Sequence, residues 1–273
     1  MRDYMKCVII ASIWGSFYSM YYIVERGSIY VSNIIIHCSI SIYDVIPSHL
    51  IEMTLKMMPI FIFQIVFGTS IYKHFCVASV YYFSRCNVRI QWFLREIVRV
   101  FVFAILYNIL IPIIVIGITA IHSSIHFDKE GGILFIYLVL LQSLWMFFVT
   151  VMMNLISIKV GSEKGFIITT GIQLTLIILL GIWDKLLPLR NIDSDQIIRN
   201  AFWLKWNPIS HLIFNWHTSN NVLVDKFIHN FEFSFCFYQS VFVFTILSSV
   251  VIIIGCIIVK YHDLIILNVE TEQ

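Results

Sequence analysis

The sequence predicts an all-α membrane protein that crosses the bilayer several times. The chain has 273 residues, of which 59% are hydrophobic and 12% are charged, whereas a soluble domain carries about 25% charged residues. Its mean hydropathy is +0.88. The net charge of +2 creates no strong field for a nucleic-acid partner, so we expect none. We therefore predict one transmembrane domain over residues 1–273.

Six apolar runs account for this fold class, because a run of about 20 such residues crosses the hydrocarbon core as a helix. The predicted spans are residues 7–24, 57–72, 100–121, 133–158, 165–183 and 240–259. No small-residue cleavage site follows the first run, so we expect a retained helix rather than a removed signal peptide. Pro59 falls in the first turn of the second run, where a missing amide proton is harmless. Pro112 predicts a kink in the third.

The most basic stretch lies between the second and third spans, at residues 81–101, and reads YYFSRCNVRIQWFLREIVRVF. On a helix its four arginines fall within an arc of about 120°, with apolar side chains on the opposite face. These arginines are Arg85, Arg89, Arg95 and Arg99. We predict an amphipathic helix that lies on the membrane surface and then turns into the third span.

Two functions suit this basic helix. As a topology anchor it needs only positive charge beside the membrane. As a docking helix it needs an exposed face that meets a soluble partner. Trp92 and Glu96 share the arginine face, and an aromatic anchor among charges is typical of a protein interface, which favours docking.

A long loop, residues 184–239, separates the fifth and sixth spans and contains two helix start signals. Asp193 or Ser194 can cap one short helix. Asn207 and Pro208 begin a second, as the cap and the first helical residue. Its apolar stripe is Ile209, Leu212, Ile213 and Trp216. Both helices are too short to span, so we predict amphipathic helices of the outer leaflet that lie in the membrane interface or dip into it.

Six spans place both termini on one side of the membrane. With the termini, residues 73–99 and residues 159–164 inside, ten Lys and Arg lie inside and eight outside. Five of the outer eight lie in the long loop, where the positive-inside rule weakens. We therefore expect a multi-pass protein with both termini in the cytoplasm.

Catalytic motifs are absent from the sequence. It contains no GxxxxGK[ST], HExxH or G-x-S-x-G, so we expect no enzyme, no bound metal and no cofactor in this chain. His122 and His126 are four residues apart but lack a nearby third ligand. Cys86, with His74 as base, is the basis of an alternative hypothesis, a membrane-embedded peptidase or acyltransferase. Cys38 and Cys236 would both be external, which permits a disulfide.

The predicted spans contain almost no ionisable groups, although ion-coupled carriers keep such groups at mid-membrane. Five amides remain: Gln64, Asn108, Gln142, Asn154 and Gln173. They either form hydrogen bonds between helices or line a path for a substrate. The lack of buried charge favours a passive membrane part that is driven from outside the bilayer.

Residues 67–107 resemble the region around the second and third spans of permease subunits in type-2, export-class ABC transporters of bacteria. Arg85, Arg89 and Trp92 match the basic turn of that family, and Trp206-Asn207-Pro208 is similar to the start of its outer-leaflet helices. The resemblance implies that a separate ABC ATPase subunit, which binds the ATP, docks on residues 81–99. The docking residues would be Arg85, Arg89, Trp92, Arg95 and Arg99.

The same resemblance implies a second permease subunit, alike or paralogous, in a bacterial plasma membrane. Cargo in the family includes peptides, antibiotics, lipids and polysaccharides, and aromatic, charge-poor spans favour an amphipathic cargo over an ion. A non-catalytic immunity or sensor protein is a further alternative, since it needs no ATPase.

Overall fold

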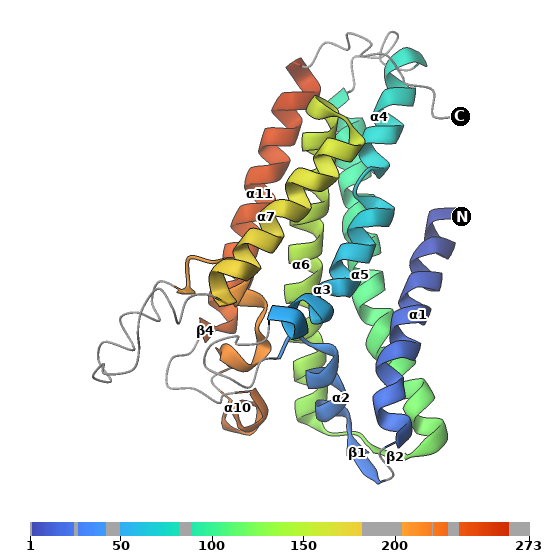
Figure 1. Ribbon diagram of the computed structural model, residues 1–273, viewed down its shortest axis with the longest axis vertical. Helices are drawn as coiled ribbons and strands as arrows, with labels where there is room; N and C mark the ends of the chain where they lie inside the picture. Colours follow the sequence, from blue (N-terminus) through green and yellow to red (C-terminus); the bar gives the residue numbers. More distant parts are fainter. Residues whose placement is uncertain are drawn as a thin grey trace, which may run out of the picture.

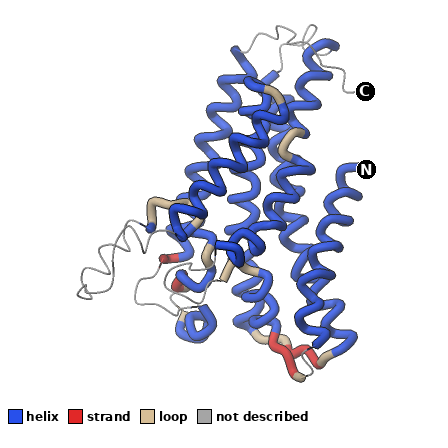
Figure 2. Tube along the Cα trace, in the orientation of Figure 1, coloured by secondary structure: helices blue, strands red, loops and turns tan. Residues whose placement is uncertain are grey.

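The structure is a computed structural model that describes residues 2–24, 27–41, 50–81, 89–181, 204–219, 221–228 and 235–261. Long helices run side by side along most of the molecule (Figure 1). One pair of short strands lies at one end of the bundle, and the other pair lies at the side of the same half (Figure 2). The main helices are α1 (Arg2–Val24), α3 (Leu50–Phe67), α4 (Ser70–Tyr81), α5 (Arg89–His122), α6 (Lys129–Val160), α7 (Ser162–Gly181) and α11 (Phe237–Tyr261). The expectation of an all-α architecture is confirmed.

Five helical segments within the described ranges are long and apolar enough to cross a membrane. They are Ile51–Cys76, Arg89–His122, Lys129–Val160, Ser162–Gly181 and Phe237–Tyr261. Each contains most of one predicted span, so the polytopic membrane class is confirmed. The predicted first span is the helix α1, which is not among these five.

The helix α1 nevertheless packs closely along α5, as Figure 1 shows. A Cβ atom on Gly15 of α1 would lie 2.7 Å from Cβ of Ile114 in α5, so only glycine permits this approach. The two helices end near each other and are joined by a parallel strand pair, β1 (Ser28–Tyr30) with β2 (Ser124–His126). The N-terminal helix is therefore an integral part of the bundle.

The second span is broken into α3 and α4 by a turn at Gly68 and Thr69. Asn154 of α6 replaces the helical hydrogen bonds that this break removes. Its Oδ1 accepts from the backbone amides of Ile71 (2.8 Å) and Tyr72 (3.1 Å), and its Nδ2 donates to the carbonyl of Phe67 (3.2 Å). The free groups at a helix end are thus satisfied by one buried side chain.

The expected place of Pro59 in its helix is wrong. The helix α3 begins at Leu50, so Pro59 lies in its interior, where proline leaves a carbonyl one turn earlier without its usual amide donor. The carbonyl of Pro59 itself accepts a hydrogen bond from the buried hydroxyl of Tyr107 in α5 (3.1 Å). The predicted span began at Met57 because the residues before it include polar ones. The helix nevertheless begins at Leu50, seven residues earlier.

Residues 27–41 contain a helix that the sequence did not reveal. The helix α2 (Val31–Cys38) is short, and six of its eight residues are buried, so it folds back into the bundle beside α6 and α5. Asp128 fixes its start: one carboxylate oxygen accepts from the amide of Ser32 (3.1 Å) and the other from Gly131, at the start of α6 (3.1 Å). The β-branched residues of α2 give no clear helical period, because most of its surface is covered and only Asn33 is exposed.

The second predicted helix of the long loop is absent. Ser210–Leu212 (η2) and Phe214–Trp216 (η3) form separate 3-10 turns, followed by the strand β3 (His217–Thr218), which pairs with β4 (Phe235–Cys236), and by α10 (Val222–Ile228). Asn207 does cap this segment, since its Oδ1 accepts from the amide of Ile209 (3.0 Å). The apolar stripe is entirely buried rather than facing lipid. The first predicted helix, residues 193–202, lies outside the described residues.

The two ends of the bundle differ in composition. We call the end formed by residues 73–81, 89–99, 159–164 and 260–261 the arginine end, and the end formed by residues 27–41, 122–130, 204–219, 221–228 and 235–240 the histidine end. Seven described cations lie at the arginine end: Lys73, Arg89, Arg95, Arg99, Lys159, Lys164 and Lys260. Three lie at the histidine end: Lys129, Lys205 and Lys226.

Candidate functional site

The basic residues of the predicted docking helix lie on the first turns of α5. This helix runs for 34 residues, which corresponds to about 51 Å, against about 30 Å for the hydrocarbon core of a bilayer. Among the described residues, therefore, there is no separate surface helix that turns into the third span. The basic segment continues directly into it, because nothing between Arg89 and Arg99 breaks a helix.

The buried face of this segment also differs from the predicted one. Phe93, Ile97 and Val100 pack into a small core with α4, α6 and α11, whereas Leu94 and Val98 are exposed. A Cβ atom on Gly255 of α11 would overlap the ring of Phe93, so these two helices are in close contact. Packing against α4, α6 and α11 therefore fixes the position of the arginine segment.

A buried carboxylate organises the charges at this end. Glu96 is only 6% exposed, and Nη1 of Arg99 donates to both of its oxygens at 3.0 Å. Nδ1 of His74 in α4 lies 3.1 Å from Oε2 of the same carboxylate. Glu96 thus joins α4 to α5, and the guanidinium of Arg99 is already paired within the chain.

Three other predicted docking residues, Arg89, Trp92 and Arg95, precede this ion pair on α5. Arg95 is exposed, and Arg89 and Trp92 are half-buried. The ring of Trp92 contacts that of Phe75 in α4, with centroids 5.9 Å apart. Arg85 lies outside the described residues, as does Cys86, the nucleophile of the enzyme hypothesis. The structure therefore brings Arg89, Trp92, Arg95 and Arg99 together on the first turns of one helix.

Three of the five amides predicted for a substrate path hold helices together. Gln64 of α3 and Gln173 of α7 form a reciprocal pair, with Nε2 to Oε1 distances of 3.0 and 2.8 Å. Both side chains are fully buried. Asn154 is fully used at the break between α3 and α4, as described above. A saturated amide inside a bundle stabilises one helix arrangement, and these three line neither of the cavities described below.

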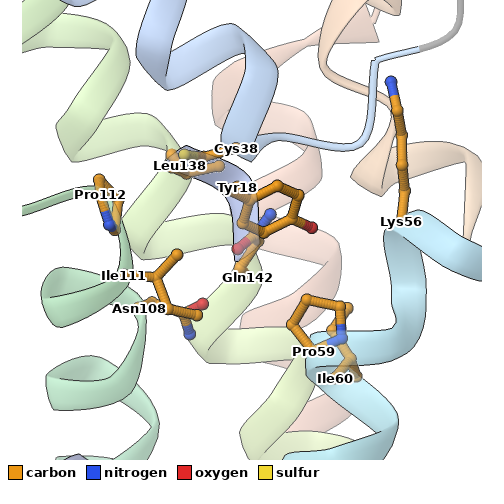
Figure 3. A pocket seen from close by; sticks show the side chains of 10 residues that line it. All are labelled: Tyr18, Cys38, Lys56, Pro59, Ile60, Asn108, Ile111, Pro112, Leu138 and Gln142. Atoms are coloured by element: carbon orange, nitrogen blue, oxygen red, sulfur yellow. The ribbon is translucent and has the colours of Figure 1, made fainter. Parts of the chain in front are cut away.

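The remaining two amides lie at a small cavity in the middle of the bundle (Figure 3). Its volume is about 10 Å³, room for about one water molecule. Asn108 donates to Oγ of Ser143 at 3.1 Å and to the carbonyl of Ala104 at 2.9 Å, while Gln142 is only partly buried. Lys56 lies on the opposite side of the cavity in Figure 3 and extends away from Asn108. In this conformation no cargo-sized path passes between these residues.

A buried group of two histidines and one serine lies at the histidine end, and sequence reasoning missed it. Nδ1 of His211 and Nε2 of His217 are each 2.8 Å from Oγ of Ser240, the fourth residue of α11. The other ring nitrogens face backbone carbonyls, His211 that of Lys205 and His217 that of Ile213, each at 2.9 Å. No motif signals this group, because its members are brought together only by the fold.

The number of protons in this group is constrained by its geometry. The two carbonyls accept the ring N–H groups, so in neutral histidines both nitrogens that face Ser240 are acceptors. One hydroxyl proton cannot serve both of them. Burial lowers the pKa of His211 and lowers that of His217 to about 3. The neutral group therefore leaves one nitrogen without a donor, and only an added proton would complete all four hydrogen bonds.

The other candidate sites from the sequence do not assemble. His122 ends α5 and His126 lies in β2, so they do not share a helical face. Within the described ranges no three His, Cys, Asp or Glu side chains gather as a metal site would require. Cys38 and Cys236 are free thiols, and burial raises the pKa of Cys38 to about 12. No family model, curated protein or solved structure matches this chain.

Proposed function

We propose that this chain is the membrane-spanning permease subunit of an ATP-driven ABC exporter, powered by a separate ATPase subunit. The observation that carries the proposal is the arginine end, where exposed and half-buried cations lie on a helix about 20 Å longer than the hydrocarbon core. The sequence has no P-loop, so the energy must come from a partner. We further propose that this end faces the bacterial cytoplasm, in keeping with the excess of cations there.

The packing of α5 suggests how such a partner would act. The helix contacts α1, α6 and α11 and also supplies Asn108, Ile111 and Pro112 to the central cavity. Because it is continuous from Arg89 to His122, a push on its first turns would move the cavity wall as well. A second permease subunit would complete the path for an amphipathic cargo such as a peptide, an antibiotic or a lipid.

The docking role is tested by association with an ATPase. The tagged full chain is produced together with each P-loop ABC ATPase encoded in the same genome, extracted in mild detergent, and assayed for bound ATPase and for ATP hydrolysis. We expect Arg95→Glu and Trp92→Ala to weaken association at least about tenfold, as loss of interface anchors does. Lys129→Glu, at the histidine end, is the matched control and should leave it unchanged. Association that withstands both docking variants would contradict this role.

A further inference from the structure

A groove lies on the side of the bundle between α1, α2 and the first turns of α3, near the histidine end. Its volume is about 320 Å³, at the lower end of the range of about 300–1,000 Å³ for small-molecule sites. It shares Tyr18 and Lys56 with the central cavity, so the two spaces adjoin. The groove combines an aromatic wall with an ion pair. This ion pair belongs to neither the arginine end nor the histidine end.

The wall of the groove consists of aromatic rings from one face of α1. Trp14 and Phe17 meet edge to face with centroids 5.4 Å apart, and Tyr21 stacks on His37 of α2 at 4.6 Å. Burial, followed by the nearby charge of Lys56, lowers the pKa of His37, so this imidazole is neutral at pH 7. Such rings attract an alkylammonium group through their π faces.

The floor of the groove carries one ion pair. Nζ of Lys56 donates to the carbonyl and, at 3.0 Å, to the hydroxyl of Ser41, and lies 3.4 Å from Oε1 of Glu52. The Lys56 side chain is 18% exposed, whereas that of Glu52 is 50% exposed. The long contact to Glu52 is the one that an incoming anion can replace. Glu52 can then turn towards a cation, because its carboxylate already reaches the opening.

The surroundings of the groove are those of a membrane interface. Glu52 and Lys56 lie in the first two turns of the span Ile51–Cys76, which places them at the level of the lipid headgroups. The side chains around the opening, Phe17, Met20, Tyr21 and Leu55, are each at least 58% exposed. Apolar side chains around a charged centre suit a molecule whose polar head enters the groove while its chains stay in the bilayer.

We infer that this groove binds the headgroup of a zwitterionic phospholipid. The phosphate would pair with Lys56, and the ammonium would lie between Glu52 and the rings of Trp14 and Tyr21. Net charge decides among the alternatives, because the Lys56–Glu52 pair is neutral and unpaired charge at an apolar site is costly. A zwitterion keeps the site neutral, whereas an anionic lipid or a cationic peptide would leave one charge in excess. The inference does not depend on an ATPase.

The test is native mass spectrometry of the purified full chain in detergent, titrated with phosphatidylethanolamine, phosphatidylcholine or phosphatidylglycerol. We expect one zwitterionic lipid per chain, preferred over phosphatidylglycerol by about tenfold. Glu52→Gln and Tyr21→Leu should each weaken it by about tenfold. Both residues are at least half exposed, so these variants should fold, and thermal midpoints check this. Glu163→Gln, an exposed acid at the arginine end, is the control.

Three results would overturn the inference. Phosphatidylglycerol binding as tightly as the zwitterions would mean that Lys56 selects an anion alone. Unchanged zwitterion binding in both variants would place the lipid elsewhere. If a Lys-rich amphipathic peptide bound in a Glu52-dependent way and no zwitterionic lipid stayed bound, the groove would be a peptide site. None of these outcomes bears on ATPase association, so the lipid site and the permease proposal fail separately.

Discussion

The arginine end and the histidine end of the bundle handle their charged and titratable groups in opposite ways. At the arginine end the buried carboxylate of Glu96 is paired with two side chains that remain more than 40% exposed, those of His74 and Arg99. At the histidine end the imidazoles of His211 and His217 are themselves buried against Ser240. The arginine end therefore leaves its cations accessible to water and to a partner. In the histidine–serine group, by contrast, the side-chain nitrogens and the hydroxyl are all shielded from both.

This difference indicates that the two ends of the bundle have different roles. Exposed cations over a well-packed small core suit contact with a soluble protein, since the helix below them is held firmly. Buried histidines, paired strands and the folded-back helix α2 close the opposite end. The groove beside α1 lies next to that closed end and keeps the Lys56–Glu52 pair within reach of the membrane.

The largest expected effect concerns the side of the membrane on which each end lies. In a cysteine-free background, Glu163→Cys at the arginine end should be labelled by an impermeant thiol reagent only after cell lysis. Ser124→Cys at the histidine end should be labelled in intact cells, because both positions are exposed and lie at opposite ends of the bundle. The measurement is the labelled fraction before and after lysis. Labelling of both in intact cells would contradict opposite locations.

The next effect is the pH dependence of the histidine end. The folded pKa of His217 lies below its ordinary value of 6.5, so the unfolded chain binds more protons and stability falls as pH drops through 6.5 towards 3. At about pH 5 the loss from one fully neutral histidine is about 2 kcal/mol. Thermal midpoints of the purified chain at several pH values measure it.

The variant His217→Gln sharpens this comparison because glutamine does not titrate. We expect it to flatten the acid side of the stability curve, although it also lowers stability at neutral pH. His122→Gln, an exposed histidine at the same end, should leave the slope unchanged. A slope that survives His217→Gln would mean that His211, beside the charge of Lys205, takes up the proton instead.

A smaller effect is expected at the arginine end from Glu96→Gln. The amide keeps the shape of the side chain but cannot neutralise Arg99, so we expect a loss of about 1 kcal/mol. A fully buried pair would lose more, but Arg99 is 44% exposed and water screens the interaction. Chemical or thermal unfolding in detergent measures the change. Glu163→Gln is the exposed control on the same side, and an equal loss there would show that Glu96 has no special role.

The smallest effect on stability is expected from Arg95→Ala. No ion pair involves this exposed side chain among the described residues, so the free energy of unfolding should change by less than about 0.5 kcal/mol. The same substitution should still weaken association with an ATPase, because the charge is lost from the proposed contact surface. A large loss of stability would show that Arg95 serves the fold rather than a partner.

Several features of this protein could be predicted from its sequence because they depend on local composition. The membrane class and the approximate positions of five spans follow from hydropathy, since each helix must satisfy its own backbone hydrogen bonds in lipid. The cluster of arginines before the third span is likewise visible as a string of residues. The sequence predicted that these arginines lie on a helix. It did not predict which face of that helix is buried, because the sequence does not show which face of α5 packs on Phe75 and Gly255.

Only the tertiary structure decided how the polar residues are used. Gln64 and Asn108 look alike in sequence, yet one is saturated by Gln173 on another helix and the other lines the central cavity. The histidine–serine group, the buried helix α2 and the groove at Lys56 all depend on contacts between segments far apart in the chain. The sequence shows where polar side chains occur in the apolar runs. The hydrogen-bond partner of each one depends on which helix faces pack together in the folded chain.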